Sequence, residues 1–142
     1  MQSDYWDKPA FETVRPRRLR APLVFNSAHS GRDYPERFLR MTRLDHLSIR
    51  QSEDAWVDEL FGRAPHLGAP LLRAHFPRAY LDVNREPWEL DPAMFAEPLS
   101  ERCNTTSPRV AAGLGTLARV VAENKPIYSE RLTLADARMR IE

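Results

Sequence analysis

Twelve prolines in a chain of 142 residues constrain the fold more than any other feature. Proline fixes the backbone angle φ at about −65° and has no amide N–H to donate, so it is poorly tolerated inside helices and central strands. Only five glycines accompany these prolines. The composition therefore predicts numerous rigid turns rather than a flexible linker.

Length and charge limit the number of domains and the kind of ligand. A chain of 142 residues has the size of one common domain and can bury a core, but it is too short for two full domains. Lysine and arginine total 21 against 20 for aspartate and glutamate, which leaves a net charge of +1. A charge so close to zero gives no broad positive electrostatic field that would attract nucleic acid or an anionic membrane. We therefore expect a small-molecule ligand.

Cys103 is the only cysteine. A single cysteine excludes an intrachain disulfide and a cysteine-rich zinc finger, and it favours a reducing compartment. The first twenty residues contain Asp4, Asp7, Glu12 and four arginines, without the apolar segment of a signal peptide or membrane-spanning helix. We therefore expect a cytoplasmic protein.

The apolar pattern predicts an N-terminal arm, residues 1–20, followed by one domain, residues 21–142. The apolar run from Leu23 to Phe25 predicts a short buried strand that leads into a loop. Beyond it the sequence predicts a helix from Ser52, strands at 71–72 and 80–83, a loop or flap over 86–108, a hairpin over 114–128 and a helix from Thr133. These elements indicate an α/β fold. The last helix has no stop signal before Glu142, so the chain is expected to be truncated.

Two residues are candidates for a metal site. His29 follows the first predicted strand, at the usual place for functional residues in an open α/β sheet. Such a histidine is either a hydrogen-bonded structural residue or a ligand. Asp54 lies in the first predicted helical turn, where an acid is favoured by the helix dipole alone. A zinc site takes histidine and carboxylate donors from separate elements, so His29 and Asp54 could supply two of its ligands.

A third candidate site follows the strand predicted at 80–83. In the sequence Asp82, Val83, Asn84, Arg85, strand alternation places Asp82 and Asn84 on one face and Arg85 on the other. An arginine at a strand end is often a surface ion pair that contributes little. Its planar fork also grips a carboxylate through two hydrogen bonds, and an asparagine beside it can add a third. The residues alone leave both interpretations open.

Four motifs follow one another along the chain, and together they carry a resemblance. They are residues 26–31 with Tyr34 and Pro35; Glu53 and Asp54 with Val57 and Asp58; Asp82 to Arg85; and residues 113–116 with Arg119, Val120, Val121, Ile127 and Tyr128. In this order the chain resembles the N-formylglutamate amidohydrolase family over nearly its whole ordered length. Each motif is short, and the specificity lies in their joint order and spacing.

The resemblance implies a zinc-exopeptidase-like fold, related to carboxypeptidases and aspartoacylase, with a mixed sheet flanked by helices and the metal at strand ends. It implies that His29 and Asp54 bind zinc, and that Asn84 and Arg85 hold the carboxylate of the substrate. Arg119 is expected to be a second anion contact. The third metal ligand and the general base come late in such relatives, so they are expected beyond Glu142, and this piece alone is expected to be inactive.

The function implied by the resemblance is hydrolysis of N-formyl-L-glutamate, or a related N-acyl amino acid, to formate and glutamate in histidine catabolism. Two alternatives remain: a non-catalytic carboxylate-binding or regulatory relative, and a structural interaction module. A sheet left open at its edge would also favour pairing, so a homo-oligomer is a further expectation.

Overall fold

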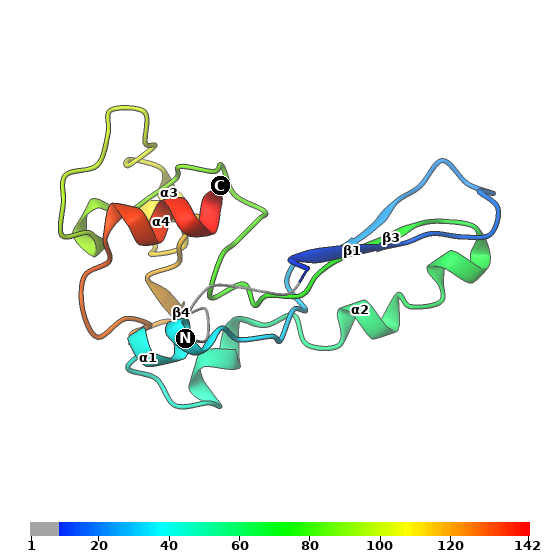
Figure 1. The fold of residues 1–142 in the computed structure, drawn as a ribbon, viewed down its shortest axis with the longest axis horizontal. Helices are drawn as coiled ribbons and strands as arrows, with labels where there is room; N and C mark the ends of the chain where they lie inside the picture. Colours follow the sequence, from blue (N-terminus) through cyan, green and yellow to red (C-terminus); the bar gives the residue numbers. More distant parts are fainter. Residues whose placement is uncertain (1–8) are drawn as a thin grey trace, which may run out of the picture.

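The computed structural model describes residues 9–142, which form a mixed α/β structure with small sheets. The sheet that contains β1 and β3 extends away from a body that holds α1, α3, α4 and β4 (Figure 1). Helix α2 belongs to the same extended part of the molecule as this sheet. The elements in chain order are β1 (Phe11–Val14), β2 (Phe25–Ser27), α1 (Glu36–Met41), η1 (Ser48–Ser52), α2 (Val57–Leu60), η2 (Ala64–Leu67), β3 (Leu71–Ala74), η3 (Pro92–Met94), α3 (Pro108–Ala111), β4 (Val120–Ala122), β5 (Lys125–Pro126) and α4 (Leu134–Ile141).

The larger sheet has three strands in the order β1, β3, β2. The central strand β3 pairs antiparallel with β1 and parallel with β2, so the sheet is mixed. Part of the predicted arm therefore supplies an edge strand, while residues 1–8 of that arm lie outside the described residues. Leu23 and Val24 precede β2 and are exposed rather than buried, because they lie before the paired part of this edge strand.

The hydrophobic core lies in the body of the molecule. Its most deeply buried large side chains include Phe38, Ile49, Leu90, Leu117, Ile127 and Leu132. The segment 86–108 is not a flap, because it sends Leu90, Met94 and Phe95 into this core. Apolar side chains without a regular period can still be buried when an irregular chain is held by proline turns such as η3.

Helix α4 begins as the sequence predicts. The Thr133 hydroxyl accepts from the Asp136 amide at 3.1 Å, and the Asp136 carboxylate accepts from the Thr133 amide at 3.2 Å. This reciprocal pair is a capping box. Near the other end of the helix, the Arg140 guanidinium lies among the rings of Phe38, Tyr80 and Tyr128 and ties α4 to the core.

Two further predicted elements differ in the structure. The strand predicted at 80–83 is absent, because the amides of Tyr80 and Leu81 donate to the Pro77 carbonyl and close a tight turn. The helix predicted from Ser52 is interrupted: η1 ends at this residue and α2 begins only at Val57. The predicted hairpin is confirmed in shorter form as β4 and β5. Within the described residues, no helix is long and apolar enough to span a membrane.

Candidate functional site

The structure brings His29 and Asp54 together. His29 lies just after β2, and Asp54 lies in the break between η1 and α2. The Asp54 amide donates to the His29 carbonyl at 3.0 Å, so the two segments are joined through the backbone. The side chains also meet, with 3.2 Å between His29 Nδ1 and Asp54 Oδ2.

A second carboxylate lies on the other side of the imidazole. His29 Nε2 is 2.8 Å from Asp82 Oδ1. The two acids differ in environment, because the side chain of Asp82 is 3% exposed while that of Asp54 is 54% exposed. The buried carboxylate can therefore fix the orientation of the ring, and the exposed one faces solvent beside Nδ1.

Asp82 is held as an anion by the groups around it. Burial alone raises the pKa of a carboxyl, but hydrogen bonds from His29 and the Asn84 amide and the charge of Arg78 outweigh it, so the pKa of Asp82 falls from 3.8 to about 2. Arg78 Nε donates to Oδ2 at 3.0 Å, and Arg85 Nη2 lies 3.4 Å from the same oxygen. Two cations thus compensate one buried charge.

An open hollow of about 510 Å³ adjoins this group. Its polar side includes Asp54, Asp82 and Arg78, and its apolar side includes Ala118 and Val121. Arg78 reaches Asp82 only through Nε, and within residues 9–142 its two terminal nitrogens have no hydrogen-bond partner. The hollow therefore combines acids, a cation with N–H groups to offer, and an apolar wall, which suits a small polar molecule.

Glu53 anchors the chain next to Asp54. Its carboxylate accepts from the Tyr34 hydroxyl at 2.5 Å and from Arg50 Nη2 at 3.0 Å. Burial and the nearby Glu53 carboxylate raise the pKa of Tyr34, so the phenol keeps its proton and remains a donor. With both of its oxygens engaged in this way, Glu53 serves to hold the segment in place.

The predicted carboxylate-binding residues, Asn84 and Arg85, lie close to Asp82, and the guanidinium of Arg85 is engaged with the protein itself. Arg85 donates to the carbonyls of Leu114 at 2.9 Å and Asn84 at 2.7 Å, and its side chain is only 9% exposed. Asn84 is exposed, and its amide N–H donates to Asp82. Their role toward a substrate stays a prediction.

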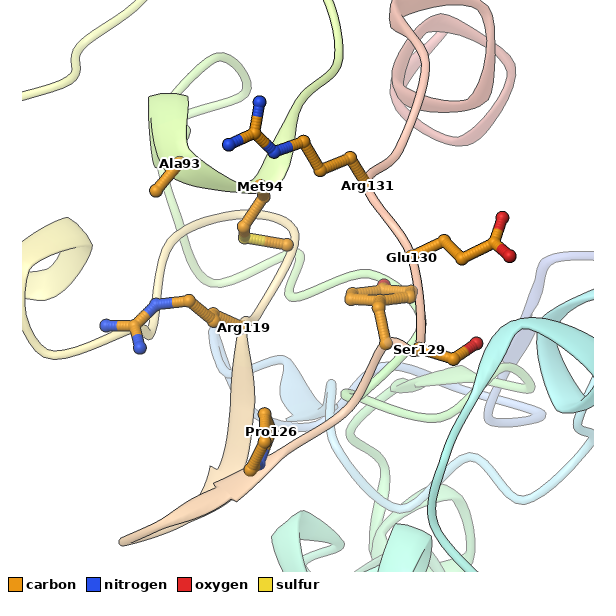
Figure 2. Close-up of a pocket in the computed structure, with 8 residues that line it drawn as sticks. Ala93, Met94, Arg119, Pro126, Ser129, Glu130 and Arg131 are labelled. Carbon is orange, nitrogen blue, oxygen red and sulfur yellow. The ribbon is translucent and has the colours of Figure 1, made fainter.

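Arg119 lies in a different hollow, of about 370 Å³, which it shares with Met94, Pro126 and Arg131 (Figure 2). Its Nε donates to Asp91 Oδ2 at 2.8 Å. The structure therefore does not bring Arg119 into the group formed by His29, Asp54 and Asp82.

The donor set on the exposed side of His29 fits a zinc ion in part. Two ligand atoms that bind one tetrahedral zinc at about 2.1 Å lie about 3.4 Å apart. This matches the 3.2 Å between His29 Nδ1 and Asp54 Oδ2. A ligating histidine commonly donates its other ring N–H to a carboxylate, as Nε2 can here to Asp82. Within residues 9–142, no three of the metal-binding residue types cluster around one point.

Sequence reasoning missed the roles of Asp82, Arg78 and Ser30. Strand alternation predicted that Asp82 and Arg85 would lie on opposite faces, which is wrong: residues 80–83 form no strand, and Arg85 Nη2 lies 3.4 Å from Asp82 Oδ2. Nothing local indicated that Asp82 would reach a histidine 53 positions away. Arg78 precedes Asp82 by four residues, and the turn at residues 78–80 brings the two side chains into contact. Ser30 adjoins His29, but its burial could not be predicted without the fold.

Two comparisons with known proteins point to the same family. Residues 21–142 match the family model described as N-formylglutamate amidohydrolase. The chain is similar to the crystal structure of an N-formylglutamate amidohydrolase from Ralstonia eutropha JMP134, with a TM-score of 0.83 and 34% sequence identity. That match covers 93% of this chain and 46% of the other, so the chain spans about half the length of its structural relative. No curated protein sequence matches significantly.

Proposed function

Because the chain belongs to the N-formylglutamate amidohydrolase family, we propose that it forms part of a zinc-dependent hydrolase. The reaction would cleave the amide of N-formyl-L-glutamate, or a related N-acyl amino acid, to formate and glutamate. The observation that carries the proposal is the position of His29 between an exposed and a buried carboxylate. The proposal includes a zinc-exopeptidase-like architecture for the whole protein.

Among the described residues, His29 Nδ1 and Asp54 Oδ2 would hold the metal. A bound zinc ion supplies Lewis acidity, which brings the pKa of water from about 15.7 toward about 7. Asp82 would accept the Nε2 proton of His29 and so keep Nδ1 free of a proton. The proposal assigns neither the third ligand nor the general base to residues 1–142.

The substrate would be bound by arginine and asparagine side chains near the hollow. Arg85 and Asn84 are proposed to hold the glutamate carboxylate, since a guanidinium grips a carboxylate through two parallel bonds. For this, Arg85 would exchange the Leu114 carbonyl, which it bonds at 2.9 Å, for the substrate. Arg78 lines the hollow and would offer its terminal N–H groups to a substrate oxygen. Arg119 is proposed as a more distant anion contact.

A second candidate is a metal-free relative that binds carboxylates without cleaving them. Its support is that Arg78 and Arg85 both contact Asp82, so two guanidinium groups that can bind a carboxylate lie at or near the hollow. Both candidates are proposed to act in the cytoplasm, which the single cysteine favours. The hydrolase would supply glutamate late in histidine catabolism.

The experiment uses the whole protein that contains residues 1–142. Formate release is measured with N-formyl-L-glutamate and with N-formyl-L-alanine, which lacks the side-chain carboxylate, before and after zinc is removed by a chelator. The hydrolase predicts turnover that prefers the acidic substrate and returns when zinc is restored. Binding of N-formylglutamate without formate release, in the presence of zinc, would favour the second candidate.

A further inference from the structure

Ser30 adjoins His29 and lies at the centre of a buried polar cluster. The residue is 2% exposed. Its hydroxyl is 2.8 Å from the Asp54 carbonyl, 3.3 Å from the Asp58 amide nitrogen and 2.7 Å from the Ser27 hydroxyl. One side chain after β2 therefore contacts both ends of the segment that carries Asp54.

The direction of each hydrogen bond follows from the chemistry of the groups. A serine hydroxyl has one hydrogen and two acceptor positions. The Asp54 carbonyl can only accept, so Ser30 gives its hydrogen there. The Asp58 amide donates to Ser30, and the Ser27 hydroxyl must donate as well. The Ser30 hydroxyl thus donates one hydrogen bond and accepts two, which is all that it can make.

This arrangement replaces a helical hydrogen bond. In an α-helix the carbonyl of residue 54 would accept directly from the amide of residue 58, four positions on. Here the Ser30 hydroxyl lies between those two groups, at 2.8 Å from the carbonyl, which also accepts more weakly from the Val57 amide at 3.4 Å. Trp56, within the segment, has left-handed angles with φ of 67°, which is costly for a bulky residue and persists only where the surroundings impose it. Helix α2 consequently begins at Val57, and Asp54 stays outside it.

We propose that Ser30 is a positioning residue whose hydroxyl keeps the Asp54 carboxylate opposite His29 Nδ1. With Ser30 bonded to the Asp54 carbonyl and the His29 carbonyl bonded to the Asp54 amide, both backbone polar groups of Asp54 are fixed by adjacent residues. The consequence for a metal ion rests on the proposed function, but the positioning of the two side chains does not.

Ser27 provides the matched control. It is a serine of the same cluster, 3% exposed, and its hydroxyl contacts Ser30 without contacting Asp54. Ser27→Ala and Ser30→Ala therefore remove the same atom from the same buried environment. A purely structural role for the cluster predicts similar effects of the two changes on every measurement.

The experiment compares the whole protein with Ser27→Ala, Ser30→Ala and Ser30→Cys. Zinc affinity is measured by competition with a chelating dye, and the ring nitrogens of His29 are followed by NMR without metal. Loss of a group that orients a ligand costs about 10- to 100-fold in metal affinity. We expect at least about a 10-fold loss for Ser30→Ala, an intermediate loss for Ser30→Cys with its weaker donor, and almost none for Ser27→Ala. The His29 Nδ1 signal should move only in the Ser30 variants.

Equal effects of Ser27→Ala and Ser30→Ala on zinc affinity and on the His29 signal would overturn the proposal. If Ser30→Ala does not fold, Ser30→Cys takes its place, and equal effects of Ser30→Cys and Ser27→Ala on zinc affinity and on the His29 signal would overturn the proposal. If the unaltered protein binds no zinc, the proposed function fails. The His29 signals of the metal-free variants still show whether Ser30 positions the pair.

Discussion

The imidazole of His29 is bonded through Nε2 to Asp82 at 2.8 Å, across 53 positions of sequence. Because Asp82 is buried and already holds Arg78, the bond leaves the ring little freedom to rotate. His29 Nδ1 is thereby aimed at the exposed Asp54 carboxylate. Asp82 therefore orients the His29 ring for whatever His29 binds through Nδ1.

Replacing Asp82 with asparagine tests this relationship. Asp82→Asn keeps the size of the side chain but removes its charge, so it should weaken zinc binding about 10- to 100-fold. The matched control is Asp136→Asn, since Asp136 is similarly buried and paired with Arg37 at 2.6 Å, far from His29 in sequence. A comparable loss of zinc affinity in both variants would show that the effect comes from general destabilisation.

The lowered pKa of Asp82 predicts a loss of stability in acid. Its folded-state pKa of about 2 lies below the usual 3.8, so the ionised form stabilises the folded state when the pH is above both values. The contribution, about 2 kcal/mol, should disappear as the pH falls from about 4 to about 2. Urea unfolding across this range measures it. The Asp82→Asn variant should lack this part of the pH dependence, and identical curves for the two proteins would contradict the assignment.

Arg85→Lys tests the carboxylate contact. An ammonium group cannot form two parallel bonds, so kcat/KM for N-formylglutamate should fall at least about 10-fold, while that for N-formylalanine changes less. Arg109→Lys, on the exposed side of α3, serves as the control. If Arg85→Ala leaves kcat/KM for N-formylglutamate unchanged, the assignment is wrong.

Arg140 provides a prediction about stability alone. The residue is 6% exposed among three aromatic rings, and its Nε has no hydrogen-bond partner within residues 9–142. Arg140→Ala should cost about 2 to 4 kcal/mol through lost packing and cation–π contact. Arg140→Met should cost less, because it fills the space and removes a buried charge. Chemical denaturation measures the free energy of unfolding of both variants, and Arg138→Ala, at an exposed position of α4, is the control. Equal losses of stability in the Arg140→Met and Arg140→Ala variants would show that the charge itself stabilises the fold.

The sequence predicted those features that depend on local chemistry. The capping box at Thr133 and the strand at residues 71–72 are confirmed, because side-chain capping and apolar clustering act within a few residues. The helix expected from Ser52 is interrupted between η1 and α2, and there Ser30, 24 positions from Asp54, donates to the Asp54 carbonyl. The bond from Asp82 to His29 has the same long-range origin. Such tertiary contacts leave no local pattern to read.

Zinc-edge anomalous diffraction from crystals of the whole protein grown with zinc tests the central claim most directly. The account predicts one peak within about 2.0 to 2.2 Å of both His29 Nδ1 and an Asp54 carboxylate oxygen, with His29 Nε2 still bonded to Asp82. Stoichiometric zinc bound elsewhere, or bound through Nε2 in place of the Asp82 contact, would contradict it.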